Sequence, residues 1–227
     1  MYSIILLSGG SGKRMHNSIP KQYMLLAGKP IIMHTIERIN KIEKVKKIII
    51  VAAENYFEAI ELMLKQYGIT KDVVFAPAGT TRQESVYNGL QYVDTEYTII
   101  HEAARPFVKL DDFNKLIEHE SPNITYGLPI PFTVIKGDKY ITGNLERSEL
   151  VNVQLPQKFK TELLKKSHIN AKKDALSFTE DASLIFHYYP EEKIEICNGM
   201  EYDIKLTTRQ DMIVGEIIYD EVFRKRK

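Results

Sequence analysis

The chain has a single cysteine, Cys197, and no tryptophan. One cysteine excludes an internal disulfide and any metal centre built from several thiolates. A free thiol is typical of a reducing compartment, so we expect a cytoplasmic protein. No apolar run approaches the roughly 20 residues that cross a bilayer, and no basic segment precedes the short apolar run near the start. We therefore expect neither a membrane partner nor a secretory signal.

The chain also lacks an excess of charge of either sign. Its 31 lysines and arginines balance 30 aspartates and glutamates, which leaves a formal net charge of +1. This balance gives no reason to expect nucleic acid as a partner, and any affinity for phosphate must be local. With 44% hydrophobic residues over 227 positions, the chain suits one domain spanning 1–227.

Short β-branched runs alternate with amphipathic stretches along most of the chain. This alternation predicts an α/β fold, a Rossmann-like and mainly parallel twisted sheet with helices on both faces. Ligands of such sheets bind at the carboxyl ends of the strands. The expected strands are 3–7, 45–51, 73–76, 97–101, 125–130 and 193–196. The expected helices are 31–39, 56–67, 81–92, 110–119, 159–167, 181–187 and 208–223.

Residues 131–155 interrupt the alternation, and no helix fits them. Two short strands, 133–136 and 139–142, flank Gly137-Asp138, a hairpin signal in the wrong order for an ideal type I′ turn. We interpret 131–155 as a β-arm that projects from the sheet. Because an isolated two-stranded ribbon is barely stable, we expect the arm to pack on a second copy of the chain and form a homodimer.

A glycine-rich, basic segment follows the first expected strand directly. Residues 7 to 21 read Leu-Ser-Gly-Gly-Ser-Gly-Lys-Arg-Met-His-Asn-Ser-Ile-Pro-Lys. Glycines let backbone N–H groups approach phosphate oxygens, and Lys13, Arg14 and Lys21 add positive charge. The spacing matches neither the ATPase phosphate loop nor the dinucleotide fingerprint. The segment predicts a triphosphate site in an enzyme that activates a small phosphorylated molecule with a nucleotide.

Two acidic residues stand beside basic ones at expected strand ends. Glu102 closes the strand 97–101 and lies near Arg105, an arrangement that suits a hydrated Mg²⁺. A surface Glu–Arg ion pair explains the same residues equally well. Asp203 could be a second metal ligand and Lys205 a phosphate clamp, with an ordinary edge strand as the alternative.

Other reactive side chains fit structural roles. Residues 179–184 begin a helix with Thr179 as its expected cap, although Asp181 could also orient a basic residue of the site. The histidines show no metal-ligand spacing. Cys197 lies in an apolar strand, where we expect it in the core.

Five segments occur together in the order that is typical of one enzyme family. They are residues 7–15, 20–23, 101–106, 155–157 and 203–207. On these segments the chain resembles, over essentially its whole length, the cytidylyltransferases that act on 2-C-methyl-D-erythritol 4-phosphate or D-ribitol 5-phosphate. The resemblance implies a nucleotidyltransferase that uses Mg²⁺ to transfer CMP from CTP to a polyol phosphate. The products would be a CDP-polyol and pyrophosphate.

The resemblance also implies a role for each matching residue. Arg14 and Lys21 would stabilise the pentacoordinate phosphorus, and Lys205 would bridge the two phosphates. Glu102 and Asp203 would hold the metal. The acceptor-binding residues would be Arg105, Thr133 and Arg147, of which the last two would reach the neighbouring subunit's site. The nucleotide-binding residues would be Leu7, Ser8, Gly9, Gly10, Gly12, Gly79, Thr80, Ser85 and Ala103.

Some residues depart from the family pattern. Glu102 stands where the family usually has Asp, Asp203 where it has Asn, and Leu155 where a Thr precedes Pro-Gln. Gly9 replaces an alanine typical of the methylerythritol enzymes, which favours a ribitol-type acceptor, whereas residues 179–184 favour the methylerythritol branch. Two alternatives stay open. One is a nucleotidyltransferase for another sugar or sugar-alcohol phosphate in capsule or cell-wall synthesis, and the other is an inactive nucleotide-binding regulatory homologue.

Overall fold

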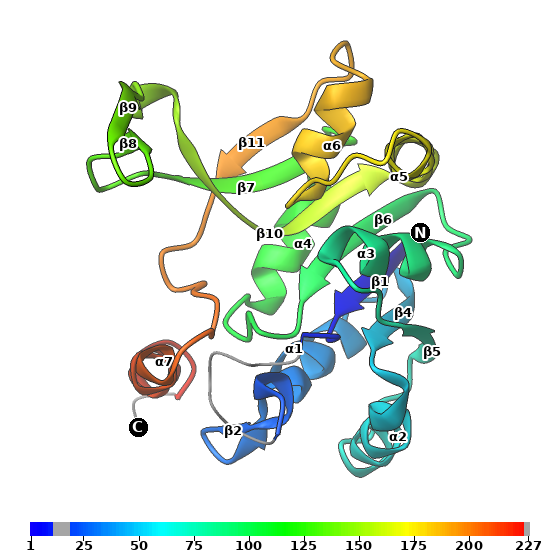
Figure 1. The fold of residues 1–227 in the computed structure, drawn as a ribbon. Coiled ribbons are helices and arrows are strands. Elements are labelled where there is room, and N and C mark those ends of the chain that lie inside the picture. Colours follow the sequence, from blue (N-terminus) through cyan, green and yellow to red (C-terminus); the bar gives the residue numbers. More distant parts are fainter. Residues whose placement is uncertain (11–18, 225–227) are drawn as a thin grey trace.

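A seven-stranded sheet forms the centre of the computed structural model, which describes residues 1–10 and 19–224 (Figure 1). The strand order is β11-β7-β10-β6-β1-β4-β5, and every neighbouring pair is parallel except those of β10, which runs antiparallel to both β6 and β7. The expectation of a mainly parallel sheet is confirmed. The strands are β1 (Tyr2–Leu7), β4 (Val45–Ala52), β5 (Asp72–Pro77), β6 (Tyr97–Glu102), β7 (Ile124–Pro129), β10 (Val151–Lys160) and β11 (Glu195–Asn198).

The central strands are apolar because both of their faces are covered. Ile4 and Ile5 of β1 are both fully buried, yet they belong to different hydrophobic clusters. Successive side chains of a strand point to opposite faces, so each cluster marks one face of the sheet. Helices therefore had to cover both faces.

Helices pack on both faces, as expected, with three on each face among the described residues. α1 (Ile31–Asn40), α2 (Phe57–Gln66) and α4 (Leu110–Glu118) contribute to the cluster of Ile4. α3 (Arg82–Leu90), α5 (Thr161–Lys173) and α6 (Asp181–Tyr188) contribute to the cluster of Ile5. The last helix, α7 (Arg209–Val222), packs on a smaller cluster around Phe107 and Leu206. The short elements are η2 (Lys21–Tyr23), β2 (Leu25–Leu26), β3 (Lys29–Pro30) and η3 (Glu54–Tyr56).

β10 is the strand of the central sheet that the sequence analysis missed. It leaves the arm and continues into the central sheet, so residues 159 and 160 are strand, and the helix expected from 159 begins at Thr161. Buried polar side chains, among them Gln157 and Lys158, hide the apolar pattern of this strand. Pro156 also argues against a central strand, but it lies where the pairing with β7 is interrupted, between Gln154 and Lys158.

The arm contains the expected hairpin, displaced by one or two residues. β8 (Ile135–Gly137) pairs with β9 (Ile141–Asn144), and η4 (Arg147–Glu149) leads back to β10. The hairpin forms a separate two-stranded sheet that projects away from the central one (Figure 1). Within the described residues, no helix has both the length and the apolar character required to cross a membrane.

Candidate active site

A cavity of about 560 Å³ opens where β1 and β6 end. Its position matches the rule that ligands of parallel sheets bind at the carboxyl ends of strands. Segments that lie far apart in the sequence form its wall. The lining residues are Leu7, Ser8, Gly9, Gly10, Lys21, Gln22, Gly79, Thr80, Thr81, Arg82, Ser85, Glu102, Ala104, Lys205 and Thr207.

The buried η2 turn is anchored on the first residues of the glycine-rich loop. The Gln22 side-chain amide donates to the carbonyls of Ser8 and Gly10, the latter at 2.9 Å. The Ser8 hydroxyl donates to the Tyr23 oxygen at 3.2 Å. These contacts place Lys21, which stands at the start of the same turn, on the cavity wall.

Packing against a neighbouring residue explains why glycine stands at position 9. A Cβ atom at this position would lie 2.4 Å from the Cβ of Ala78, a distance that no side chain adopts without a shift of the backbone. Since Ala78 already occupies that space, position 9 has no room for a side chain and requires glycine. This explanation removes most of the weight from Gly9 as an argument for a ribitol-type acceptor.

Hydrogen bonds from its own side chains hold the segment 79–85 in place. The Ser85 hydroxyl accepts from the N–H of Gly79 at 3.0 Å and donates to the Thr81 carbonyl at 2.9 Å. Both the N–H and the hydroxyl of Thr80 donate to the Glu84 carboxylate at 2.7 Å. Gly79, Thr80 and Ser85 therefore lie together on the wall, beside the start of α3.

Glu102 is the acidic centre of the cavity. Its Oε2 lies 2.6 Å from the Lys205 ammonium and 4.0 Å from Nε of Arg105, and its Oε1 lies 3.4 Å from Nε of Arg82. Burial alone would raise the pKa of Glu102, but Lys205 and Arg82 hold it below its usual range. The cavity therefore presents an ionised carboxylate with cations around it.

Asp203 lies outside the cavity lining and pairs with Arg105. The Arg105 guanidinium donates to its Oδ2 at 3.2 Å and to its backbone carbonyl at 3.0 Å. Burial raises the pKa of Asp203 to about 7 even though Arg105 opposes the shift. Its other oxygen, Oδ1, has no hydrogen-bond partner among the described residues.

The two carboxylates fit Mg²⁺ unequally. Mg²⁺ keeps several waters and uses one or two carboxylates together with substrate phosphates, so Glu102 on the cavity wall would suffice as the protein ligand. The unpartnered Oδ1 of Asp203 is a suitable oxygen donor, but it does not reach the lining.

The other predicted site residues that the structure describes lie outside the cavity lining. Arg14 and Gly12 fall outside the described residues. Ala103 is buried, and its N–H pairs with the Leu7 carbonyl. Thr133 and Arg147 belong to the arm, and Arg147 lines a different hollow of about 540 Å³.

Arg82 is a site residue that the sequence analysis missed. It lines the cavity and begins α3. A cation at the start of a helix is unfavourable for the helix dipole. An arginine at the expected start of a helix was therefore an indication in the sequence that an acidic partner lies nearby.

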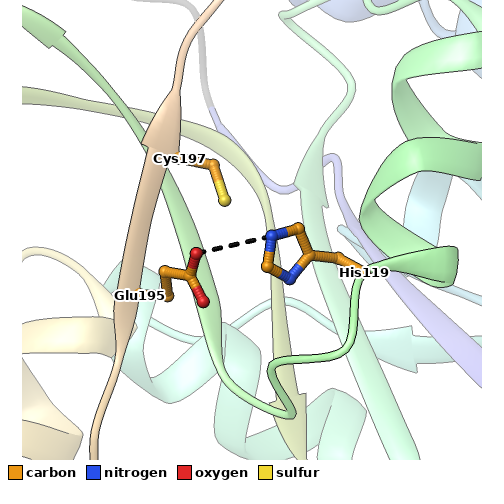
Figure 2. Close-up of side chains that lie close together, drawn as sticks. All are labelled: His119, Glu195 and Cys197. Atoms are coloured by element: carbon orange, nitrogen blue, oxygen red, sulfur yellow. Dashed lines mark ion pairs between the residues drawn. The ribbon is translucent and has the colours of Figure 1, made fainter.

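A second group of potential ligands lies away from the cavity, at His119, Glu195 and Cys197, whose ligand atoms are within 4.8 Å of one another (Figure 2). Nδ1 of His119 accepts from the N–H of Ser121 at 3.2 Å, so in the neutral ring the proton sits on Nε2, which faces Glu195 at 3.4 Å. The ammonium of Lys158 donates to the His119 carbonyl at 2.8 Å and adds positive charge. We interpret the group as a histidine–glutamate pair beside a thiol and assign it no metal.

Cys197 itself differs from the expectation of a core residue. It is only partly buried, and it packs against the edge of a core cluster from the outermost strand, β11.

Comparisons with known proteins give matches over nearly the whole chain. A family model described as IspD, 2-C-methyl-D-erythritol 4-phosphate cytidylyltransferase, matches residues 2–221. A protein of that name from Bacillus cytotoxicus is 36% identical over 220 residues, which cover 95% of this chain and 96% of the relative. The chloroplastic protein of that name from Oryza sativa subsp. japonica is 34% identical over 225 residues, covering 96% of this chain and 74% of the relative.

Solved structures show the same architecture. The 4-diphosphocytidyl-2C-methyl-D-erythritol synthase from Anaerococcus prevotii has a TM-score of 0.83 at 23% identity, with 95% of this chain and 94% of that chain covered. At this identity the likeness shows the fold alone. The bifunctional IspDF from Campylobacter jejuni has a TM-score of 0.75 at 29% identity, and the match covers 92% of this chain and 53% of that one.

Proposed function

The chain belongs to the IspD family of 2-C-methyl-D-erythritol 4-phosphate cytidylyltransferases, and on that premise we propose that it transfers CMP from CTP to 2-C-methyl-D-erythritol 4-phosphate. One observation about the site carries the proposal. Lys21, Arg82 and Lys205 line one cavity beside a glycine-rich loop and a single ionised carboxylate, Glu102. A wall of this kind suits a polyphosphate and a cation that accompanies it.

The reaction needs alignment and charge stabilisation more than a general base, because the acceptor phosphate is already an anion. One of its oxygens attacks the α-phosphorus of CTP in line and forms a new P–O bond. The bond between the α-phosphorus and the bridging oxygen to the β-phosphorus breaks, and its electrons leave with pyrophosphate. Lys21 and Lys205 would stabilise the negative charge on the phosphates, and Arg14 would add to it from the segment outside the described residues.

The nucleoside would bind to the remaining wall of the cavity. Amides of the loop after β1, at Ser8, Gly9 and Gly10, would approach the triphosphate and ribose. The polar groups of Gly79, Thr80 and Ser85 would recognise the cytosine edge, since they lie together on the same wall.

Mg²⁺, when bound, would neutralise charge on the triphosphate. Glu102 would hold it, because this carboxylate is ionised and lies on the cavity wall. Lys205 now pairs with Glu102, and we expect it to move to the phosphates when nucleotide binds.

The acceptor side would require a second copy of the chain. Large apolar side chains of the arm are exposed, with Phe132 at 76%, Tyr140 at 74% and Ile141 at 69%. We expect a second copy to cover them, because exposed apolar patches mark contact surfaces and a lone hairpin is weak. Thr133 and Arg147 would then bind the acceptor phosphate in the partner's cavity, with Arg105 contributing from the chain that owns the cavity.

The function is tested by pyrophosphate release with each of the four NTPs against 2-C-methyl-D-erythritol 4-phosphate and D-ribitol 5-phosphate. We expect turnover with CTP and the methylerythritol acceptor. Turnover with ribitol 5-phosphate alone would move the assignment to that acceptor, and turnover with UTP or dTTP and a sugar phosphate would move it to another nucleotidyltransferase. Tight CTP binding without release for any acceptor would favour an inactive binding protein.

A further inference from the structure

Arg82 is held from two sides at the edge of the cavity. Its Nη2 lies 2.8 Å from Oδ2 of Asp181, and its Nε lies 3.4 Å from Oε1 of Glu102. Burial would lower the pKa of Arg82, but Asp181 and Glu102 more than offset it, so the guanidinium stays charged. These contacts explain how a cation can begin α3 despite the helix dipole.

Asp181 lies outside the cavity lining and is itself fixed by a third residue. It is the first residue of α6, it is buried, and its Oδ1 accepts from Nε2 of His168 at 2.9 Å. His168 is buried on α5, and its Nδ1 has no partner among the described residues, so the bond to Asp181 anchors the ring. Burial alone would raise the pKa of Asp181, yet Arg82 and His168 together lower it to about 2.

The same arrangement occurs on the other side of Glu102. Arg105 places its Nη1 on the buried Asp203 at 3.2 Å and turns its Nε toward Glu102 at 4.0 Å. Each arginine beside Glu102 is therefore shared with a buried aspartate. A free guanidinium would instead grip a carboxylate with two parallel N–H bonds, which is its strongest geometry.

We propose that Asp181, fixed by His168, is a positioning residue that restrains Arg82 to a single contact with Glu102 and so keeps Glu102 available to a divalent cation. The inference rests on the proposed function, because the cation is the one that would accompany CTP. Without the charge of Asp181, Arg82 would turn both donors to Glu102 and compete with the cation. Partners one step removed from a metal ligand typically change metal affinity by about 10- to 100-fold.

The test compares the wild type with Asp181→Asn, which keeps the size of the side chain and removes its charge. We expect the Mg²⁺ concentration for half-maximal pyrophosphate release to rise by about tenfold or more. The KM for the acceptor should stay within about twofold, and excess Mg²⁺ should restore most of kcat. Asp181→Glu, which keeps the charge, should recover part of the Mg²⁺ affinity. Asp174→Asn, an exposed aspartate at the end of α5, is the matched control and should behave as the wild type.

A double variant shows whether Asp181 acts through Arg82. If it does, adding Arg82→Gln to Asp181→Asn should remove most of the loss of Mg²⁺ affinity that Asp181→Asn causes alone, because the competing guanidinium is gone. A double variant that keeps the full loss of Mg²⁺ affinity would overturn the inference, as would a wild-type Mg²⁺ dependence in Asp181→Asn or an equal loss toward all substrates. If Asp181→Asn unfolds at a lower temperature than the control, Asp181→Glu and Arg82→Gln still decide the question.

A readout without turnover separates this inference from the proposed function. The Nε–H signal of Arg82 in a ¹⁵N-resolved NMR spectrum should shift in Asp181→Asn and stay in place in Asp174→Asn. An unmoved signal would contradict the positioning role. Absence of pyrophosphate release by the wild type, together with a shifted signal, would overturn the function but support the contact.

Discussion

Single residues at the site are set by their immediate neighbours as much as by the ligand. Gly9 is the clearest case, because the Cβ of Ala78 occupies the space that a side chain at position 9 would need. The glycine that the sequence analysis interpreted as a sign of substrate preference is a consequence of packing between the segments that follow β1 and β5. The pair should therefore behave as a unit when either member changes.

Gly9→Ala should destabilise the fold by about 1–3 kcal/mol, the usual cost of overpacking, and raise the KM for CTP. Adding Ala78→Gly should recover most of both losses, because it removes the atom that the new Cβ meets. Urea unfolding and steady-state kinetics measure the two effects. Gly10→Ala is the control for stability, since a Cβ there meets no described atom within 4 Å. Equal losses in the single and double variants would refute the packing explanation.

His34 should make stability depend on pH. Burial lowers its pKa from the usual 6.5 to about 4, while its ring nitrogen Nε2 bonds the Leu26 carbonyl at 2.9 Å. As the pH falls from 6.5 toward 4, the unfolded chain takes up a proton that the folded chain refuses. The free energy of unfolding should therefore drop by up to about 3 kcal/mol from this residue.

The His34 effect is isolated by substitution. His34→Gln keeps an N–H donor and does not titrate, so urea unfolding at pH 7 and pH 4.5 should show a smaller drop than in the wild type. His187→Gln changes an exposed histidine and should leave the drop unchanged. The assignment fails if the drop is the same in His34→Gln as in the wild type.

At the scale of elements, the sequence predicted the strands and helices whose burial follows a regular pattern of apolar residues. β1, β4 and β6 are apolar runs because both of their faces are covered, and the helices beside them have one apolar stripe. β10 was missed because its polar residues are buried on partners from other elements. Lys158, for example, donates to the carbonyl of His119 at the end of α4, a contact that no local pattern reveals.

The same distinction holds for the site. Lys21, Glu102 and Lys205 were predicted because they follow strand ends or lie in motifs. Arg82 was missed because its pairing with Asp181, which lies on another helix, cannot be inferred from the sequence around it. Asp181 itself was noted as a residue that could orient a basic residue of the site, but that residue could not be named without the fold.

The N-cap of α3 links an element to the site. The Thr81 hydroxyl accepts from the N–H of Glu84 at 3.0 Å, and the same segment carries Gly79, Thr80 and Ser85 on the cavity wall. Thr81→Ala should cost about 1 kcal/mol of stability and raise the KM for CTP, because the segment loses its anchor. Thr81→Ser retains the oxygen and should remain near the wild type in thermal unfolding and kinetics. An unchanged melting temperature in Thr81→Ala would show that the N-cap does not stabilise the fold.

At the scale of the whole molecule, the account requires two chains. The cavity and the arm lie in different parts of one chain, and Arg147 lines a hollow of its own. If the arm completes the partner's site, Lys21→Ala and Arg147→Ala remove residues from opposite sides of that shared site. Each variant dimer should then have two defective sites.

Mixing the two variants should restore activity. In a mixed dimer one site keeps both Lys21 and Arg147, so a 1:1 mixture that exchanges freely should regain about one quarter of the wild-type activity. Pyrophosphate release before and after mixing measures the effect, and light scattering confirms the dimer. A mixture no more active than its components, although the chains have exchanged, would place both residues in the same chain's site.

The central claim is that the cations of this cavity stabilise the transfer of CMP from CTP. The most direct test is kcat for pyrophosphate release from CTP and 2-C-methyl-D-erythritol 4-phosphate in Lys21→Ala, with the exposed Lys41→Ala as the control. Loss of one preorganised charge contact should lower kcat by roughly 10²-fold in Lys21→Ala and leave Lys41→Ala at the wild-type rate. Wild-type turnover in Lys21→Ala would contradict the account.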